Sequence, residues 1–319
     1  MEISQDQKEM LSVGHIQPPT KIGDRWHKTH KNPVTWSKIV REIKRPFIQF
    51  FYAPIDIVLH RLPKLKQAEK EFPTVLSLNE TVDLLIGGAS ICRFGDGEFN
   101  CLKWQYTAGV RSPEWAFARR MEEVLAHSSA LSCHATPNSQ NQLIIAIPPF
   151  SPSRNNMPNR YGWLNFWEDF WSKHWEFLRT KLINRTFGNS FVSRESVFYE
   201  VDVEKIRSIW SGRDVVFVVG KNSRFFDDPR LFSSMRSAEY LFVEPQDAWR
   251  HYDVTLEKAL TFDKSKLFVI CAGYMATVLA FDLYHHGYQA LDMGHLPNCY
   301  AEYLKEAPCP EWLAEVIVR

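Results

Sequence analysis

Short, continuous runs of apolar residues alternate with amphipathic stretches from residue 77 towards the C-terminus. Runs such as LIIAI at 143–147 and DVVFVV at 214–219 show no alternation of polar and apolar positions. Strands of this kind are buried on both faces, which is typical of a parallel sheet covered by helices. The alternation predicts an α/β fold with a Rossmann-like, mostly parallel sheet and helices on both faces. Similar runs predict further strands at 89–94, 240–244, 266–272 and 288–293.

Helix signals separate these runs. Ser77 and Glu80 form a capping box, and the helix that it opens is expected to end at Gly87–Gly88. A helix is predicted over 112–127, with a proline at its favoured first position. A long aromatic helix is expected over 161–183, where the tryptophans supply either a buried core or a platform for sugar rings. Other helices are predicted near 229–236, 246–260 and 274–286.

The chain changes character near residue 76, and we expect a basic, helical N-terminal extension over 1–76 and one main domain over 77–319. Basic and aromatic residues are interleaved at 25–66, where the acidic residues are only Glu42 and Asp56. Such a segment either lies on an anionic membrane surface or is a solvated basic face that packs through its aromatic side chains. The basic residues are Arg25, Lys28, Lys31, Lys38, Arg41, Lys44, Arg45, Arg61, Lys64 and Lys66.

Composition narrows the classes of function. The chain has 319 residues, of which 45% are hydrophobic and 24% are charged, as in soluble globular proteins with a sizeable core. The formal net charge of +1 gives no support for nucleic-acid binding. The six cysteines contain no C-x-x-C pair, which argues against a zinc ribbon and suits a reducing compartment. Without an apolar leader or a spanning stretch of about 20 residues, we expect a cytoplasmic protein, peripheral at the inner membrane face if 25–66 binds lipid.

The stretch RFGDGEF at 93–99 places two carboxylates, Asp96 and Glu98, on either side of one glycine after a predicted strand. Because like charges at this spacing repel, a positive partner is expected. Mg²⁺ and Mn²⁺ usually take one or two protein carboxylates and complete their shell with substrate phosphates. A neighbouring arginine such as Arg93 is a second candidate. An ordinary surface turn is the third, since Asp-Gly is a common turn dipeptide.

Further polar loops follow the other predicted strands, and ligands of open parallel sheets bind beyond the carboxyl ends of the strands. Small and basic residues there can hold phosphate through backbone N–H and guanidinium groups, although each loop also suits an ordinary turn. Neither a Walker A spacing nor G-x-G-x-x-G is present. Asp292 and His295 in LDMGH are candidates for metal binding or acid–base chemistry. The candidate phosphate- or sugar-binding residues are Asn189, Ser190, Ser193, Arg194, Gly220, Lys221, Ser223, Arg224 and Gly273.

The ordered combination of these motifs resembles the GT-D-type glycosyltransferases, a family long catalogued as a domain of unknown function. The resemblance covers about residues 77–305 and leaves the basic segment outside it. The matching blocks are SICRFGDGEFN, FGNSFVSR, IWSGRDVVFVVGKNSRFFDDPRLF, VEPQDAWRHYD and ATVLAFDLYHHGYQALDMGH, followed by Tyr300.

The resemblance implies that 77–319 is a Rossmann-like catalytic domain with a D-x-E motif that helps to bind a divalent cation, typically Mn²⁺, and a UDP-sugar. The motif falls on Asp96 and Glu98. The expected function is metal-dependent transfer of a hexose from a UDP-sugar to a glycan or glycoprotein acceptor, with Mn²⁺ or Mg²⁺ as cofactor. The expected catalytic residues are Asp96, Glu98, Asp292 and His295, and the expected metal ligands are Asp96, Glu98 and His295. The expected donor-binding residues are Arg93, Gly95, Asn189, Ser190, Arg194, Gly220, Ser223, Arg224 and Gly273.

Two other classes of function fit the same sequence. A metal-dependent phosphoesterase on a similar sheet would hydrolyse a nucleotide-sugar without any acceptor. A non-catalytic scaffold of a glycan-assembly complex would dock through residues 25–66 and would tolerate loss of Asp96 and Glu98. Hydrolysis without acceptor distinguishes the first from a transferase, and substitution of the two carboxylates distinguishes the second.

Overall fold

The computed structural model describes residue 55 and residues 57–103, 115–127, 142–152, 165–244 and 248–310. Most of the basic N-terminal extension lies outside these residues, as does the predicted helix start at Ser112–Pro113. The chain divides into two compact units. The first unit holds the described residues between Thr74 and Pro148 and those from Thr186 onwards. The second unit holds the described residues up to Pro73 and those between Pro149 and Arg185.

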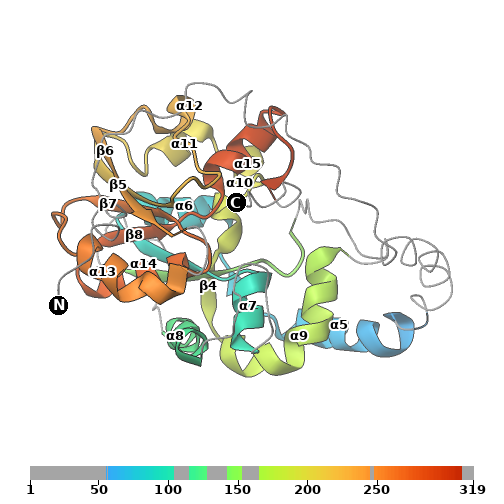
Figure 1. Ribbon diagram of the computed structural model, residues 1–319. Helices are drawn as coiled ribbons and strands as arrows, with labels where there is room; N and C mark the ends of the chain where they lie inside the picture. The colour runs from blue at the N-terminus through green and yellow to red at the C-terminus, as the bar shows by residue number, and fades with distance from the viewer. Residues whose placement is uncertain are drawn as a thin grey trace, which may run out of the picture. The chain divides into compact units, whose positions relative to one another are not determined.

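The first unit is built on an eight-stranded sheet in the order β1-β4-β3-β2-β8-β7-β5-β6 (Figure 1). Every pair of neighbouring strands is parallel, so the predicted α/β fold with a parallel sheet is confirmed. All carboxyl ends of the strands therefore lie at one edge of the sheet. The strands are β1 (Thr74–Val75), β2 (Ser90–Arg93), β3 (Leu143–Ile147), β4 (Thr186–Asn189), β5 (Asp214–Gly220), β6 (Ser237–Val243), β7 (Leu267–Cys271) and β8 (Gln289–Asp292).

Two of these strands, β1 and β4, were not predicted from the sequence. Each is short, and β4 contains Gly188 and Asn189, residue types that are depleted in strands. Strand β1 pairs with β4, and β4 also pairs with β3. Strand β6 also begins three residues before its predicted start at residue 240, because it pairs with β5 along its whole length.

Helices cover both faces of this sheet, and Figure 1 shows α11 and α12 on the opposite side of the strands from α13 and α14. Helix α14 packs on β2, β7 and β8, whereas α6 packs on β4. The helices of the first unit are α6 (Leu78–Ile86), α7 (Asp96–Leu102), α8 (Trp115–Ala126), η3 (Ser190–Ser193), α10 (Val197–Glu200), α11 (Val203–Arg207), α12 (Pro229–Phe232), η4 (Ala248–His251), α13 (Tyr252–Ala259), α14 (Met275–His285) and α15 (Leu296–Tyr303).

The capping box that opens α6 is present as predicted. The N–H of Glu80 donates to Ser77 Oγ at 3.2 Å, and the N–H of Ser77 donates to Glu80 Oε2 at 2.8 Å. The helix ends at Gly87, and Gly88 follows with φ +102°, a conformation that glycine adopts without strain. The predicted helix at 246–260 is instead a 3₁₀ turn followed by α13.

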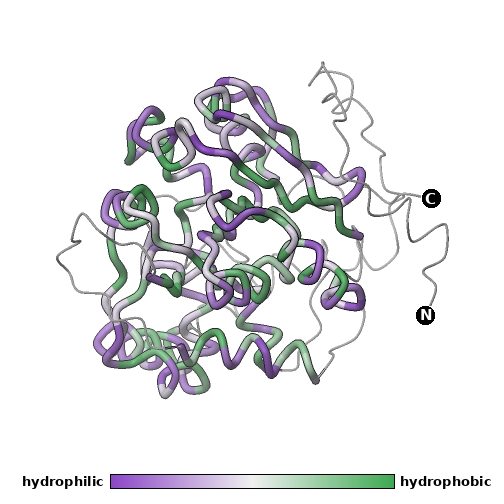
Figure 2. Tube along the Cα trace, turned by 90° about the vertical axis from the view of Figure 1, so that its left-hand side faces the viewer, coloured by the Kyte–Doolittle hydropathy of each residue, from purple (hydrophilic) through white to green (hydrophobic). Residues whose placement is uncertain are grey.

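The core of the first unit lies between the central strands and their covering helices. Ile91, Val216, Phe217 and Phe268 have no exposed surface. Figure 2 shows hydrophobic stretches alternating with hydrophilic ones along the chain. The five described cysteines are all free thiols. None of the described helices is long and apolar enough to cross a membrane.

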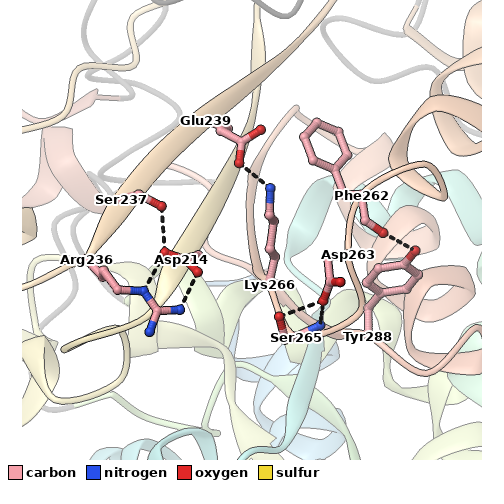
Figure 3. Close-up of polar contacts among 9 residues, drawn as sticks. All are labelled: Asp214, Arg236, Ser237, Glu239, Phe262, Asp263, Ser265, Lys266 and Tyr288. Atoms are coloured by element: carbon pink, nitrogen blue, oxygen red, sulfur yellow. Dashed lines mark hydrogen bonds and ion pairs between the residues drawn. The ribbon is translucent and has the colours of Figure 1, made fainter.

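The amino-terminal edge of the sheet carries a network of polar contacts (Figure 3). Arg236 and Ser237 both bond to the carboxylate of Asp214, and Lys266 pairs with Glu239. Hydrogen bonds from Arg236 hold the pKa of Asp214 well below its usual range, so this carboxylate stays charged at neutral pH. These groups join the first residues of β5, β6 and β7, and they lie at the edge opposite to the candidate site.

The second unit contains η2 (Ile57–Arg61), α5 (Leu62–Glu71) and α9 (Phe166–Leu182), and α5 packs on α9. Phe72 packs against Trp171 and Trp175, which are both buried. These tryptophans are therefore core residues rather than a platform for sugar rings. The sequence-based boundary at residue 76 placed 149–185 in the main domain, whereas the aromatic contacts join this range to α5.

Candidate functional site

One side chain, Arg93 at the end of β2, joins the carboxyl ends of several strands. Its Nη2 donates to Asp292 Oδ1 at 2.8 Å, and its Nε donates to the backbone carbonyl of Asp292 at 2.6 Å. Its Nη1 reaches the carbonyl of Ser190, which follows β4, at 3.4 Å. Thr277 on α14 donates to the carbonyl of Arg93 at 3.0 Å and to Asp292 Oδ2 at 3.2 Å. The loops after β2, β4, β7 and β8 are thereby held together.

The path of the Arg93 side chain depends on Gly294. This glycine has φ +48°, and a Cβ there would overlap Arg93 Nη2 and lie 3.2 Å from Arg93 Cζ. Arg93 was one candidate for the positive partner of Asp96 and Glu98; its charge lowers the pKa of Glu98, but its hydrogen bonds go to Asp292 and Ser190. Because Gly294 has no side chain, the guanidinium lies over the loop after β8 instead.

The D-x-E motif forms the first turn of helix α7, not the glycine loop that the sequence indicated. Gly95 is the N-cap, and its N–H donates to Glu98 Oε2 at 2.8 Å. The N–H of Phe99 donates back to the carbonyl of Gly95 at 3.1 Å, which closes the turn. The dipole of a helix favours negative charge at this end, so α7 itself offsets part of the repulsion between the two carboxylates.

A second glycine fixes how this turn sits against the rest of the site. A Cβ on Gly97 would overlap the ring of Tyr274 and would lie 2.7 Å from its Cζ. Tyr274 is the N-cap of α14 and follows β7. The ring therefore packs directly on the backbone between Asp96 and Glu98, and its contact sets the position of both carboxylates.

Glu98 is in an unusual electrostatic environment for a carboxylate. Burial and the negative charge of Asp292 raise its pKa to about 7, and these effects outweigh the opposing ones of Arg93 and the Gly95 N–H. Asp96 is partly exposed, and the structure records no hydrogen bond to its carboxylate from another described residue. The motif thus offers a partly exposed carboxylate, Asp96, and a second carboxylate, Glu98, whose charged form a cation would strongly stabilise.

Positive charge gathers around His295, at the start of α15. Burial lowers the pKa of His295 to about 3, so the imidazole is neutral at neutral pH. Three arginines around it act in the same direction, since like charges disfavour protonation. They are Arg194, Arg224 and Arg93. An environment that excludes the imidazolium in this way is complementary to an anion.

Arg224 is held in place by the C-terminal part of the first unit. Its Nη1 donates to the carbonyl of Pro310 at 2.7 Å, and its own carbonyl accepts from Asn298 Nδ2 at 3.1 Å. Asn298 lies on α15, three residues after His295. The loop after β5 and the loop after β8 are therefore joined on this side of the site.

Other predicted site residues have structural roles in the described contacts. Asn189 Oδ1 caps η3 by accepting from the Phe191 N–H at 3.0 Å. Ser190 contributes its carbonyl to Arg93. Ser223 Oγ accepts from the Phe225 N–H at 3.3 Å within the turn after Gly220. Gly273, just before α14, has φ +62°. This backbone conformation by itself accounts for the presence of a glycine at this position.

The donor set at the motif fits a hard divalent cation only if a substrate supplies further ligands. Among the described residues, no three His, Cys, Asp or Glu side chains are grouped so that they could hold a metal ion. Asp96 and Glu98 supply carboxylate oxygens, and Mg²⁺ or Mn²⁺ commonly binds through two such groups together with phosphates and water. His295 as a third ligand stays a prediction. Asp292 has both carboxylate oxygens bonded to Arg93 or Thr277, which favours a positioning role for it.

Sequence reasoning did not identify Tyr274, Thr277, Gly97 or Gly294 as site residues. Each acts through a tertiary contact with a residue that is far away along the chain. Thr277 and Arg93, for example, are 184 positions apart. The only signal in the sequence is the concentration of glycines next to charged residues in RFGDGEF and DMGH.

Comparison with known families identifies the class of protein. The model of the glycosyltransferase GT-D fold family matches residues 91–313, which is more than half of the chain. The chain therefore belongs to this family, and the family that the motifs resembled is confirmed. The match contains Asp96, Glu98, Arg93, Asp292 and His295.

Two curated relatives are named as glycosyltransferases. The chain is 27% identical over 239 residues to glycosyltransferase GlyD of Streptococcus pneumoniae serotype 4, covering 72% of this chain and 28% of that protein. It is 24% identical over 256 residues to the probable glycosyl transferase Gly of Streptococcus gordonii, covering 77% and 35%. The chain thus spans about a third of the length of these curated relatives.

Solved structures share the fold. A structure described as the highly conserved domain of unknown function 1792, with a distinct glycosyltransferase fold, has a TM-score of 0.65 at 26% identity. The similarity covers 77% of this chain and 86% of that chain. A glycosyltransferase of the same domain type from Streptococcus sanguinis has a TM-score of 0.60 at 24% identity, over 74% and 86% of the two chains, and shows the fold alone.

Proposed function

We propose that the chain is a metal-dependent glycosyltransferase that moves a hexose from a UDP-sugar to a glycan or glycoprotein acceptor. The observation that carries this proposal is the juxtaposition of two kinds of charge at one edge of the sheet. Two carboxylates begin α7, and three arginines surround a neutral His295 at the start of α15. A nucleotide diphosphate with its cation needs both, because the cation binds carboxylates and the phosphates bind arginines.

In this proposal Asp96 and Glu98 hold Mn²⁺ or Mg²⁺. The bound ion would neutralise charge on the diphosphate leaving group. Burial of Glu98 makes its uncompensated charge unfavourable, so cation binding and ionisation of this carboxyl favour each other. Tyr274 and Gly97 fix the turn that carries both carboxylates.

The arginines act on the diphosphate. Arg194 and Arg224 would stabilise the charge that develops as the glycosidic bond to the diphosphate breaks. Arg93 acts through Asp292 and Thr277, because its hydrogen bonds hold the loops of the site in register. Neutral His295 would donate or accept a hydrogen bond with the donor rather than add another cation.

Incubation with UDP-hexoses, with and without oligosaccharide and glycopeptide acceptors, tests the proposal. We expect UDP release to rise several-fold when a suitable acceptor is present, since transfer is the favoured reaction, and we expect a glycosylated product by mass spectrometry. A phosphoesterase would cleave the donor equally fast without any acceptor and would give no glycosylated product. Substitution of Asp96 and Glu98 provides the control for the scaffold alternative, because a transferase should lose donor binding and transfer whereas a scaffold should tolerate the change.

A further inference from the structure

Three large aliphatic side chains are exposed at the start of the second unit. The exposed fractions are 59% for Ile55, 58% for Val58 and 62% for Leu59. Isolated exposed apolar residues are common on soluble proteins, but neighbouring ones of this size indicate a binding surface. Most other exposed large apolar residues among the described ones stand alone in the sequence, as Ile86 and Val254 do.

The three side chains come from one short stretch of the chain. Val58 and Leu59 lie in η2, which is a five-residue π-helix, and they follow Ile55 by three and four residues. Arg61 in η2 pairs with Asp169 on α9, so this short helix is attached to the folded part of the second unit. The apolar side chains are thus presented by a supported element.

Basic residues lie close to these apolar residues in the sequence. Lys64 and Lys66 follow on α5 and are exposed, as is His60. Over 25–66, ten lysines and arginines stand against two acidic residues, so the chain around the apolar side chains is strongly positive. Aliphatic side chains beside a basic segment are the combination that binds the interface of an anionic bilayer. An acidic protein surface would match the lysines but would leave the aliphatic side chains without an apolar partner.

We propose that Ile55, Val58 and Leu59, together with Lys64 and Lys66, dock the chain onto an anionic lipid membrane. The aliphatic side chains would enter the boundary between headgroups and acyl chains, and the lysines would contact anionic headgroups. This docking does not depend on the proposed transferase activity. It would place the enzyme where membrane-attached acceptors are concentrated.

Co-sedimentation of the full chain with lipid vesicles tests the docking surface. The probes are vesicles of phosphatidylcholine alone and vesicles of equal parts phosphatidylcholine and phosphatidylglycerol. We expect sedimentation with the second kind only, with release at high salt because lysine–headgroup attraction is screened. Val58→Asp combined with Leu59→Asp should lower the bound fraction by about tenfold, and Lys64→Glu combined with Lys66→Glu should do the same.

Val254→Asp is the matched control, since Val254 is also an exposed aliphatic residue but lies on α13 in the first unit. It should bind vesicles as the unchanged chain does. Equal partitioning of the Val58→Asp, Leu59→Asp variant and the unchanged chain would overturn the proposal. A second result would also overturn it: the unchanged chain binds no vesicles but forms a dimer in size-exclusion chromatography, and the variant does not. The surface would then bind a second copy of the chain. Far-ultraviolet circular dichroism verifies that every variant is folded.

Discussion

Replacing Asp292 with alanine should lower the free energy of unfolding by about 3–5 kcal/mol, the usual cost of removing one partner from a buried ion pair. Asp292 is almost fully buried, and its carboxylate bonds to the guanidinium of Arg93 and to Thr277. Without the carboxylate, the largely buried Arg93 guanidinium would lose its ion-pair partner. A loss of this size is a large part of the about 5–15 kcal/mol that stabilises a typical domain.

Urea unfolding of the purified variant measures this effect. Asp292→Asn should lose less, because an amide keeps the shape and can still accept a hydrogen bond from Arg93. Glu123→Ala is the control, since Glu123 is an exposed partner of Arg120 and its loss should cost less than about 1 kcal/mol. If Asp292→Ala is as stable as Glu123→Ala, the Arg93–Asp292 pair does not hold the loops of the site together.

Gly97→Ala adds one methyl group to the motif, and we expect it to reduce both stability and nucleotide binding. The new Cβ would overlap the Tyr274 ring, so either the ring or the first turn of α7 must shift. Overpacking of this kind costs about 1–3 kcal/mol and would also displace Asp96 and Glu98. We expect lower thermal stability together with at least tenfold weaker metal-dependent nucleotide binding, an effect of about 1.4 kcal/mol.

A double-mutant cycle with Tyr274→Ala separates this contact from a general effect of alanine. Alanine is better than glycine inside a helix by about 0.5–1 kcal/mol, so without the ring Gly97→Ala should be neutral or stabilising. The change of sign between the two backgrounds is the expected signature of a direct contact. An equal cost in both backgrounds would mean that the Tyr274 ring does not set the position of the motif.

The fold was predictable from the sequence wherever a strand is buried on both faces. LIIAI is apolar throughout and DVVFVV is apolar after Asp214, and β3 and β5 are found at these residues. Strand β4 was missed because its sequence, TFGN, is short and contains glycine and asparagine, and its pairing with β3 is a tertiary property. Helix α7 was missed because an acidic glycine-containing stretch is equally typical of a turn, and the Gly95–Glu98 and Phe99–Gly95 hydrogen bonds that define the helix start are not visible in the sequence.

The candidate site was predictable only as a set of loops. The order of the motifs placed Arg93, Asp96, Glu98, Asp292 and His295 at strand ends, because carboxyl ends of parallel strands share an edge. Which side chains pair could not be deduced, since Arg93 and Asp292 are 199 positions apart and their contact needs a glycine at 294. Asn189 and Ser223 stay predictions as ligand-binding residues; their side chains also bond to nearby backbone, which is a common use of such residues in turns.

Calorimetric titration of UDP into the purified chain, with Mn²⁺ and then with EDTA, tests the central claim most directly. We expect binding with Mn²⁺ that is lost in EDTA and lost in Glu98→Ala, because the carboxylates of α7 and the diphosphate hold the same ion. Glu123→Ala, which removes an exposed carboxylate on α8, should bind as the unchanged chain does. UDP binding that is equally tight in EDTA and in Glu98→Ala would contradict a metal-dependent donor site at the start of α7.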